Sequence, residues 1–286
     1  MKRDMREGSV VCLHPGGTHR MAWTEWGDAA NPCVLICAHS LTRVGRDFDE
    51  LAKALCDEYR VICPDVVGRG RSDWLPNGSL YTLPQYCADM LTLIATIAPR
   101  ELFWLGTSMG GLIGMGLASQ ALTSIRKLVL NDIGPVLTRE FLGRVDQYIG
   151  KSPRFDDMAA AENYMRRIYA SFGEHTEAGW LQLTRHAVMR DSDGSYRLRY
   201  DPAIADNFSM ALATGMDFNL WPFYDMIRCP TLVLRGAQSD LLTPDIAAAM
   251  TRRGPHATLV EIQNVGHAPT LMDAMQISIV RNFLAA

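Results

Sequence analysis

The chain has 286 residues, of which 48% are hydrophobic and 21% are charged, and its formal net charge at pH 7 is −3. This composition is typical of a globular protein and excludes a largely disordered chain. The slight negative charge provides no general attraction to nucleic acid or to an anionic membrane, so we expect neither as a partner.

The first residues, MKRDMREGSVVCLHPGG, lack the apolar run of a signal peptide, and no run in the chain approaches 18 apolar residues. The seven cysteines are odd in number and form neither a Cys-x-x-Cys pair set nor a spaced Cys/His set. We therefore expect reduced thiols, no structural metal, no cofactor and a cytoplasmic location.

Short apolar runs alternate with helical patterns along most of the chain. The runs SVVCL and HRMAWTEWG predict a β-hairpin around HPGG. Buried strands are then predicted at 33–39, 60–66, 101–107, 127–133, 230–236 and 257–263, and helices at 46–59, 83–99, 109–121, 244–253 and 274–285. This alternation predicts an α/β fold with a mostly parallel, eight-stranded sheet and helices on both faces.

The alternation breaks between about Gly134 and Asp225, where the patterns are mostly helical and a polar turn, DSDGSYRLRYD, interrupts them. A segment of that length is too long for a loop. We therefore expect a core formed by residues 1–134 and 226–286, with an inserted helical cap, or lid, at 135–225.

A serine between two glycines follows the predicted strand at 101–107. In Gly106-Thr107-Ser108-Met109-Gly110, the residues two before and two after the serine are small. A nucleophile on a sharp strand-to-helix turn requires this, because neighbouring backbone comes too close for a Cβ atom. The following helix also directs N–H groups toward the serine. We interpret Ser108 as a nucleophile, in preference to a simple helix N-cap.

A serine hydroxyl needs a base to attack a carbonyl. His267, in NVGHAPTLMD, follows the last predicted strand, so it lies at the same edge of the sheet as Ser108. His39 ends a strand, and the remaining histidines fall in turns, at the surface or in the predicted cap: His14, His19, His256, His175 and His186. We predict that His267 is the base.

Two aspartates are candidates for the acid that orients the imidazole of His267. Asp240 follows the strand at 230–236, and Asp132 follows the strand at 127–133. The order Ser108, Asp240, His267 matches a known arrangement of such triads. We therefore predict Asp240, and expect Asp132 to support the first turn of the cap.

Together these segments resemble the α/β-hydrolase family. AHSLTR, PDVVGRGRSD, GTSMGG, LRGAQSD and GHAP occur in that order, and the likeness spans nearly the whole chain. The resemblance implies the α/β-hydrolase fold and an oxyanion hole formed by the backbone N–H groups of Leu41 and Met109. The family usually has His-Gly where this chain has His39-Ser40, and the Ser40 hydroxyl is a hypothetical third donor.

The predicted cap supplies the candidates for substrate selection. Trp180, Trp221 and Phe223 are expected either to line a mainly apolar pocket or to pack within the cap. The same segment has three arginines that either meet a substrate carboxylate or are simply solvated: Arg166, Arg167 and Arg185.

These features predict an enzyme that cleaves a small or medium carboxylic ester through an acyl-enzyme. Three alternatives stay open. One is an enol-lactonase or C–C bond hydrolase of aromatic catabolism, and another is a cofactor-free haloperoxidase-like or acyltransferase activity of the same triad. The third is a non-catalytic binding module on the same fold. The expected partner is a small ester or lactone substrate, and the sequence does not indicate an oligomeric state.

Overall fold

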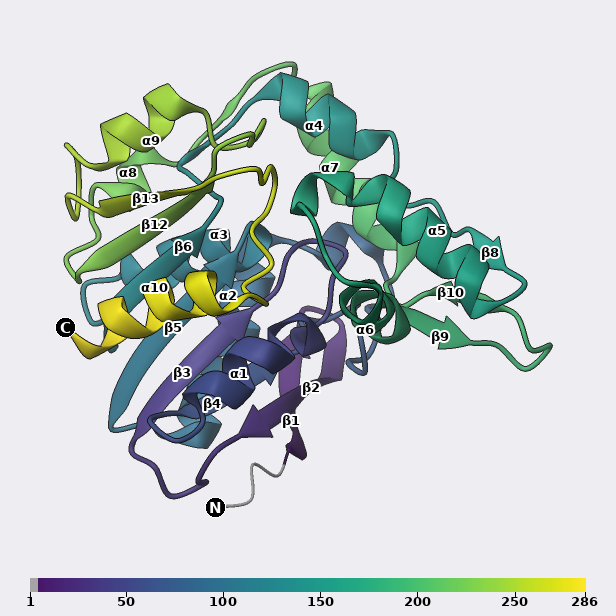
Figure 1. The fold of residues 1–286 in the computed structure, drawn as a ribbon, viewed down its shortest axis with the longest axis horizontal. Helices are drawn as coiled ribbons and strands as arrows, with labels where there is room; N and C mark the ends of the chain where they lie inside the picture. Colours follow the sequence, from purple (N-terminus) through teal and green to yellow (C-terminus); the bar gives the residue numbers. More distant parts are fainter. Residues whose placement is uncertain (1–4) are drawn as a thin grey trace.

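The computed structural model describes residues 5–286, and an eight-stranded sheet runs through its centre (Figure 1). In spatial order the strands are β1 (Arg6–His14), β2 (Gly17–Trp26), β4 (Arg60–Pro64), β3 (Cys33–Ala38), β5 (Glu101–Thr107), β6 (Ile125–Asn131), β12 (Thr231–Gly236) and β13 (Thr258–Ile262). The pairs β1–β2 and β2–β4 are antiparallel, and all other neighbouring pairs are parallel. The predicted fold class is confirmed.

Both faces of the sheet are apolar, because successive side chains of the central strands point to opposite faces and are buried on each. In β3, Val34 and Ile36 pack into one hydrophobic cluster, and Leu35 and Cys37 pack into another on the opposite face. The first cluster also takes in side chains of helices α2 and α3, and the second those of α1 and α10. Burial on both sides is what makes these strands continuous apolar runs in the sequence.

Two of the long helices that pack on the sheet, α2 and α10, begin at side-chain caps. The hydroxyl of Thr82 accepts from Gln85 N–H at the start of α2, and Asp273 does the same for Gln276 at the start of α10. The helices outside residues 135–225 are η1 (Gly45–Phe48), α1 (Asp49–Leu55), η2 (Gly78–Leu80), α2 (Leu83–Ile97), α3 (Met109–Ala118), α9 (Pro244–Met250) and α10 (Ala274–Ala285), and α8 (Trp221–Tyr224) lies at the end of that range.

Residues 135–225, here called the inserted segment, leave the sheet after β6 and gather beside one end of it before α8 leads back to β12 (Figure 1). Before α8 they form β7 (Val136–Leu137), α4 (Arg139–Asp146), β8 (Arg154–Phe155), α5 (Met158–Ile168), η3 (Ala170–Phe172), α6 (Glu177–Ala187), β9 (Val188–Arg190), β10 (Tyr196–Leu198), η4 (Pro202–Ile204), α7 (Ala205–Ala213) and β11 (Phe218–Asn219).

The polar stretch DSDGSYRLRYD is not a simple turn. Its first part turns between β9 and β10, which pair antiparallel, and β8 joins them in a three-stranded sheet. The strands have only two or three residues each, too few to display a two-residue period in the sequence.

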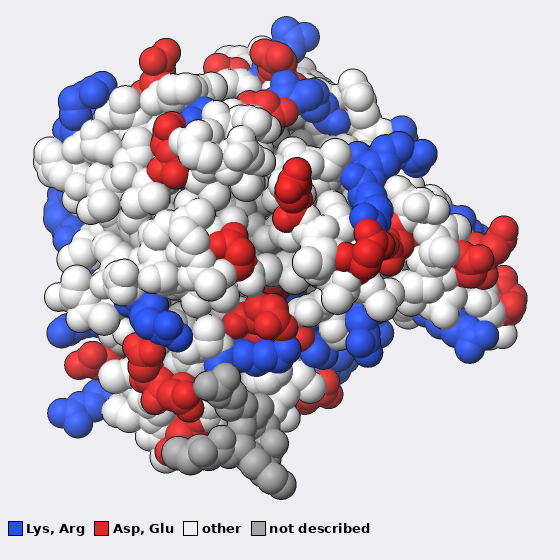
Figure 2. Space-filling model, viewed as in Figure 1, with Lys and Arg blue, Asp and Glu red and all other residues white. Residues whose placement is uncertain are grey.

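Charged side chains of both signs are interspersed on the face seen in Figure 2. This face offers no broad single-sign surface of the kind that attracts a polyanion. Within residues 5–286, none of the helices combines the length and apolar character that a bilayer crossing requires.

Candidate active site

Ser108 lies on the sharp turn between β5 and α3, with φ 52° and ψ −115°. This left-handed region of φ is unusual for a residue with a side chain. A Cβ on Gly106 would overlap the carbonyl of Gly110, and a Cβ on Gly110 would overlap the carbonyl of Ala38. Both glycines are therefore required for the turn that raises Ser108 above the sheet edge.

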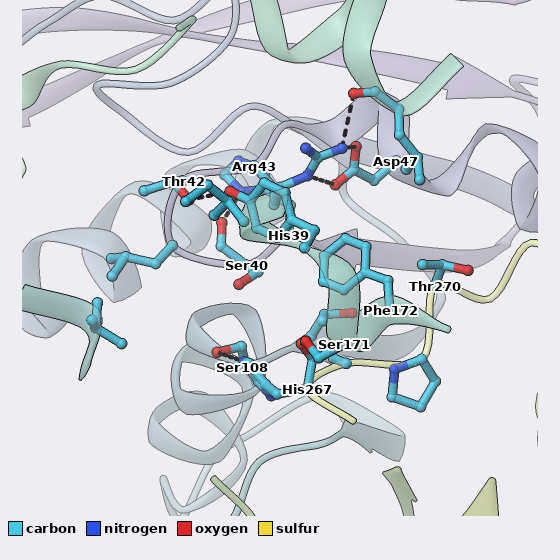
Figure 3. Close-up of a pocket in the computed structure, with 18 of the residues that line it drawn as sticks. His39, Ser40, Thr42, Arg43, Asp47, Ser108, Ser171, Phe172, His267 and Thr270 are labelled. Atoms are coloured by element: carbon cyan, nitrogen blue, oxygen red, sulfur yellow. Dashed lines mark hydrogen bonds and ion pairs between the residues drawn. The ribbon is translucent and has the colours of Figure 1, made fainter. Parts of the chain in front are cut away.

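His267 connects Ser108 to a buried carboxylate. Its Nε2 lies 3.0 Å from Ser108 Oγ, and its Nδ1 lies 2.8 Å from Asp132 Oδ2 (Figure 3 shows the contact with Ser108). An ionised carboxylate can only accept, so Nδ1 carries the proton in this pair. In a neutral imidazole, Nε2 is then the acceptor for the Ser108 hydroxyl, which is the arrangement a general base needs.

Asp132 is completely buried at the end of β6. Besides His267, its carboxylate accepts from Gly236 N–H at 2.8 Å and from the Ser239 hydroxyl at 2.6 Å. Hydrogen bonds to a charged group are stronger than neutral ones, and they compensate for its loss of water. Ser239 was not predicted as a site residue. Its position just before Asp240 is the one sequence feature that could have indicated it.

The structure corrects the expected placement of Asp240. Its side chain is 55% exposed and pairs with Arg144 of α4 at 2.8 Å, and His267 is bonded to Asp132 instead. Both aspartates follow strands that lie side by side, β6 and β12, at the same edge of the sheet. Chain order is the same for both, so it could not distinguish them. Asp132 is thus more than a support for the inserted segment.

The loop that carries His267 is held by the inserted segment. The hydroxyl of Ser171 in η3 donates to the His267 carbonyl at 2.7 Å, and the backbone carbonyl of Ser171 accepts from Gly266 N–H at 2.7 Å. The ring of Phe141 in α4 meets the imidazole edge to face, with 5.7 Å between centroids. The position of the base therefore depends on residues far from it in sequence.

His39 fixes the loop after β3. Its Nε2 accepts from Val66 N–H at 2.9 Å, so Nδ1 carries the proton and donates to the Ser40 carbonyl at 2.7 Å. Burial lowers the pKa of His39 to about 3, so the ring is neutral at ordinary pH. The Ser40 carbonyl and the Leu41 N–H belong to one peptide and point in opposite directions. The bond to His39 therefore also sets the direction of the Leu41 N–H.

The predicted oxyanion donors fit this geometry. Met109 is the first residue of α3, where a helix leaves N–H groups without intrahelical partners. Leu41 and Ser40 line the same cavity as Ser108, and Ser40 points into it on the side on which Ser108 lies (Figure 3). The roles of Leu41, Met109 and the Ser40 hydroxyl stay predictions.

The cavity has a volume of about 230 Å³. Most of its wall is apolar or aromatic, contributed by the core loops and by the inserted segment: Leu41, Phe48, Phe141, Val145, Tyr148, Ile168, Tyr169, Phe172 and Leu183. Its charged lining residues form two ion pairs, Arg43–Asp47 and Arg144–Asp240. Such a space suits a small, largely apolar ligand.

Comparison with known proteins identifies the family. The profile of the alpha/beta hydrolase fold matches residues 34–273. The chain belongs to the α/β-hydrolase fold family. It is a hydrolase, and it is 48% identical to a protein of Cupriavidus necator named 3-hydroxybutyrate-oligomer hydrolase, over 99% of each chain.

Other proteins similar to this α/β-hydrolase also bear the names of hydrolases. It is 25% identical to a 2-(acetamidomethylene)succinate hydrolase of Mesorhizobium japonicum over 88% of each chain. A putative hydrolase from Rickettsia typhi has a similar structure, with a TM-score of 0.90, 33% identity and 99% coverage of both chains. The structure of an α/β-hydrolase from Novosphingobium aromaticivorans is also similar, with a TM-score of 0.87 and 31% identity over 100% of this chain and 99% of that chain.

Trp180, Trp221 and Phe223, expected either to line the pocket or to pack within the cap, lie outside the cavity wall. Trp180 is buried against His175, with 5.3 Å between ring centroids. Trp221 stands edge-on to Tyr224 in α8, and Phe223 is 46% exposed. None of the three is among the residues found to line the cavity. Aromatic character alone could not show which face of a helix meets the cavity.

The arginines suggested for a substrate carboxylate are not in the cavity wall either. Arg166 bonds to Glu162 at 2.7 Å and to Glu177 at 2.6 Å, and Arg167 lies over the ring of Tyr164. Arg166 and Arg167 are therefore partnered within the inserted segment.

One group of metal-ligand type occurs among the described residues, formed by Cys12, His19 and Asp89. His19, expected in a turn or at the surface, is buried and bonds to Asp89 at 3.0 Å. Burial raises the pKa of the Cys12 thiol to about 12, and a protonated thiol is a poor metal ligand. The cluster joins β1 and β2 to α2 and is remote in the fold from the residues around Ser108.

Proposed function

We propose that this α/β-hydrolase cleaves the ester bonds of short 3-hydroxybutyrate oligomers. The contact of His267 with both Ser108 and Asp132 carries the proposal, because it supplies the nucleophile and base that ester hydrolysis needs. The name of the Cupriavidus necator relative, 48% identical over nearly the full length, supports this substrate class.

The proposed mechanism begins with attack of Ser108 Oγ on the ester carbonyl while His267 Nε2 takes the hydroxyl proton. Asp132 stabilises the resulting imidazolium, and the N–H groups of Leu41 and Met109 face the developing oxyanion. His267 then gives its proton to the leaving alkoxide. The acyl group stays on Ser108 until a water molecule, deprotonated by His267, releases the acid.

The size and lining of the cavity support a short substrate. A 3-hydroxybutyryl unit is small and carries a methyl group, so it suits about 230 Å³ of mainly apolar space. A long polymer chain would have to pass the residues of the inserted segment, which contribute much of the wall. We therefore propose short oligomers in place of polymer.

The test compares wild type with Ser108→Ala on four kinds of compound: the 3-hydroxybutyrate dimer and trimer, p-nitrophenyl butyrate, a lactone, and a vinylogous diketone. We expect wild type to cleave the oligomers with the highest kcat/KM and Ser108→Ala to be inactive on all of them. A fluorophosphonate probe should label wild type and not the variant.

Preference for the lactone or the diketone would overturn the proposed substrate and favour the enol-lactonase or C–C hydrolase alternative. Oligomer hydrolysis that survives Ser108→Ala, in a variant of unchanged thermal stability, would overturn the proposed nucleophile.

A further inference from the structure

Arg144 and Asp240 form an ion pair where the cavity reaches solvent. Arg144 Nη2 lies 2.8 Å from Asp240 Oδ2 and 3.1 Å from the Asp240 carbonyl oxygen. Both residues line the cavity, and their side chains are 36% and 55% exposed. Arg144 belongs to α4 of the inserted segment and Asp240 to the loop after β12, so the pair joins the two walls.

A single aromatic ring separates this arginine from the base. Phe141 meets the imidazole of His267 edge to face, with centroids 5.7 Å apart. The guanidinium carbon of Arg144 lies 5.7 Å from the centroid of the same ring. Phe141 and Arg144 are three residues apart on α4, and such residues share a helix face. The cavity wall on the His267 side therefore carries the Arg144 guanidinium just beyond an apolar surface, where it is paired with Asp240 and, at 3.2 Å, with Glu140.

The leaving part of the substrate lies on that side, because His267 protonates the leaving oxygen. In the 3-hydroxybutyrate dimer, the leaving part is one 3-hydroxybutyrate, whose carboxylate is three bonds from the ester oxygen. We propose that Arg144 binds this terminal carboxylate, that Asp240 holds the same position in the free enzyme, and that the exchange selects oligomers ending in a free acid. This inference rests on the proposed function.

The exchange is chemically balanced, since one carboxylate replaces another on the same guanidinium. An exposed ion pair contributes little to stability, so a substrate can displace Asp240. Arg43, the other arginine in the wall, has a side chain only 2% exposed and is held by Asp47 through two bonds of 2.7 Å. Arg43 is therefore part of the framework of the cavity and is not exchangeable.

The test measures kcat/KM for the 3-hydroxybutyrate dimer and for its methyl ester, and takes the ratio of acid to methyl ester. The dimer is used because it has a single ester bond, so it can be cleaved in only one binding position, with its terminal carboxylate on the leaving part. Arg144→Gln should lower this ratio about tenfold or more, mainly through KM for the acid. Asp240→Asn should raise the ratio, because it removes the carboxylate that pairs with Arg144 Nη2 and leaves only the Glu140 pair on Nη1.

Both variants weaken the link between α4 and the loop after β12, although Asp240→Asn keeps the bond from Arg144 to the backbone carbonyl of residue 240. If the pair were only a structural link, both would shift the ratio in the same direction or leave it unchanged, and either result would overturn the inference. Arg166→Gln is the matched control, since Arg166 is a paired arginine of the inserted segment outside the cavity wall. It should leave the ratio at the wild-type value.

The outcomes separate the two proposals. If wild type cleaves the dimer and Arg144→Gln has the wild-type ratio, the proposed carboxylate site is overturned and the proposed function stands. Wild type that cleaves neither the dimer nor its methyl ester would overturn the proposed function, and the carboxylate site with it.

Discussion

The carboxylate of Asp132 accepts from Gly236 N–H, the Ser239 hydroxyl and His267 Nδ1, and these contacts hold it where a triad acid must lie. Ser108 and His267 could be identified because a glycine-flanked turn and a loop after the last strand are both visible as local patterns. The choice of acid depends on which side chain turns toward His267, and neighbouring parallel strands bring Asp132 and Asp240 to one edge. Only the hydrogen bonds from Gly236, Ser239 and His267 separate them.

Asp132→Asn should lower kcat on a neutral ester by about 10⁴-fold, because the amide no longer holds the imidazole in the required tautomer. Asp240→Asn should lower it far less, since that side chain bonds to Arg144. Steady-state kinetics on p-nitrophenyl butyrate provide the measurement, with circular dichroism to verify folding. The opposite ranking of the two variants would show that Asp240 is the acid.

At the scale of elements, the long buried strands and amphipathic helices were predictable, and the short elements of the inserted segment were not. The runs at 101–107 and 33–39 correspond to β5 and to β3, which ends one residue earlier. The strands β8, β9 and β10 depend on pairing between distant segments, which a local pattern does not contain. The contact between η3 and the His267 loop is equally non-local.

That contact predicts an effect of η3 on catalysis. Ser171→Ala removes the hydrogen bond to the His267 carbonyl, so we expect slower labelling by a fluorophosphonate and a lower kcat. The free energy of unfolding should fall by only about 1 kcal/mol, the usual contribution of one such bond. Ser171→Thr keeps the hydroxyl and serves as the control. Equal labelling rates in wild type and Ser171→Ala would contradict this role.

For the whole molecule, the alternation of buried strands and helices was enough to predict the sheet and its two covered faces. The volume and lining of the cavity were not predictable, because they depend on how the inserted segment lies against the sheet. The aromatic residues that line it, such as Phe141 and Tyr169, have no local signal that separates them from Trp180 or Trp221.

Buried His39 should make the stability of the whole molecule depend on pH. The pKa of His39 is lowered from 6.5 to about 3, mainly by burial, so between these values the unfolded chain binds a proton that the folded chain does not. Its contribution to stability is complete above pH 6.5 and is lost as pH falls toward 3, at up to about 1.4 kcal/mol per pH unit.

Denaturant unfolding at pH 7, 6, 5 and 4 tests this dependence. His39→Gln should reduce the slope of unfolding free energy against pH relative to wild type. His186, whose pKa burial lowers to about 4, adds a slope in the same direction over a narrower pH range, between about 4 and 6.5. If His39→Gln had the wild-type slope, His39 would not be the source of this pH dependence.

The backbone of Ser108 links activity to stability. A side chain at φ 52° and ψ −115° costs on the order of 1–3 kcal/mol, and Ser108→Ala retains that cost while Ser108→Gly removes it. Although both variants are inactive, Ser108→Gly should melt at the higher temperature in scanning calorimetry. The nucleophile is thus kept at the expense of thermal resistance, and a glycine variant would provide a more robust protein in which to trap an uncleaved oligomer.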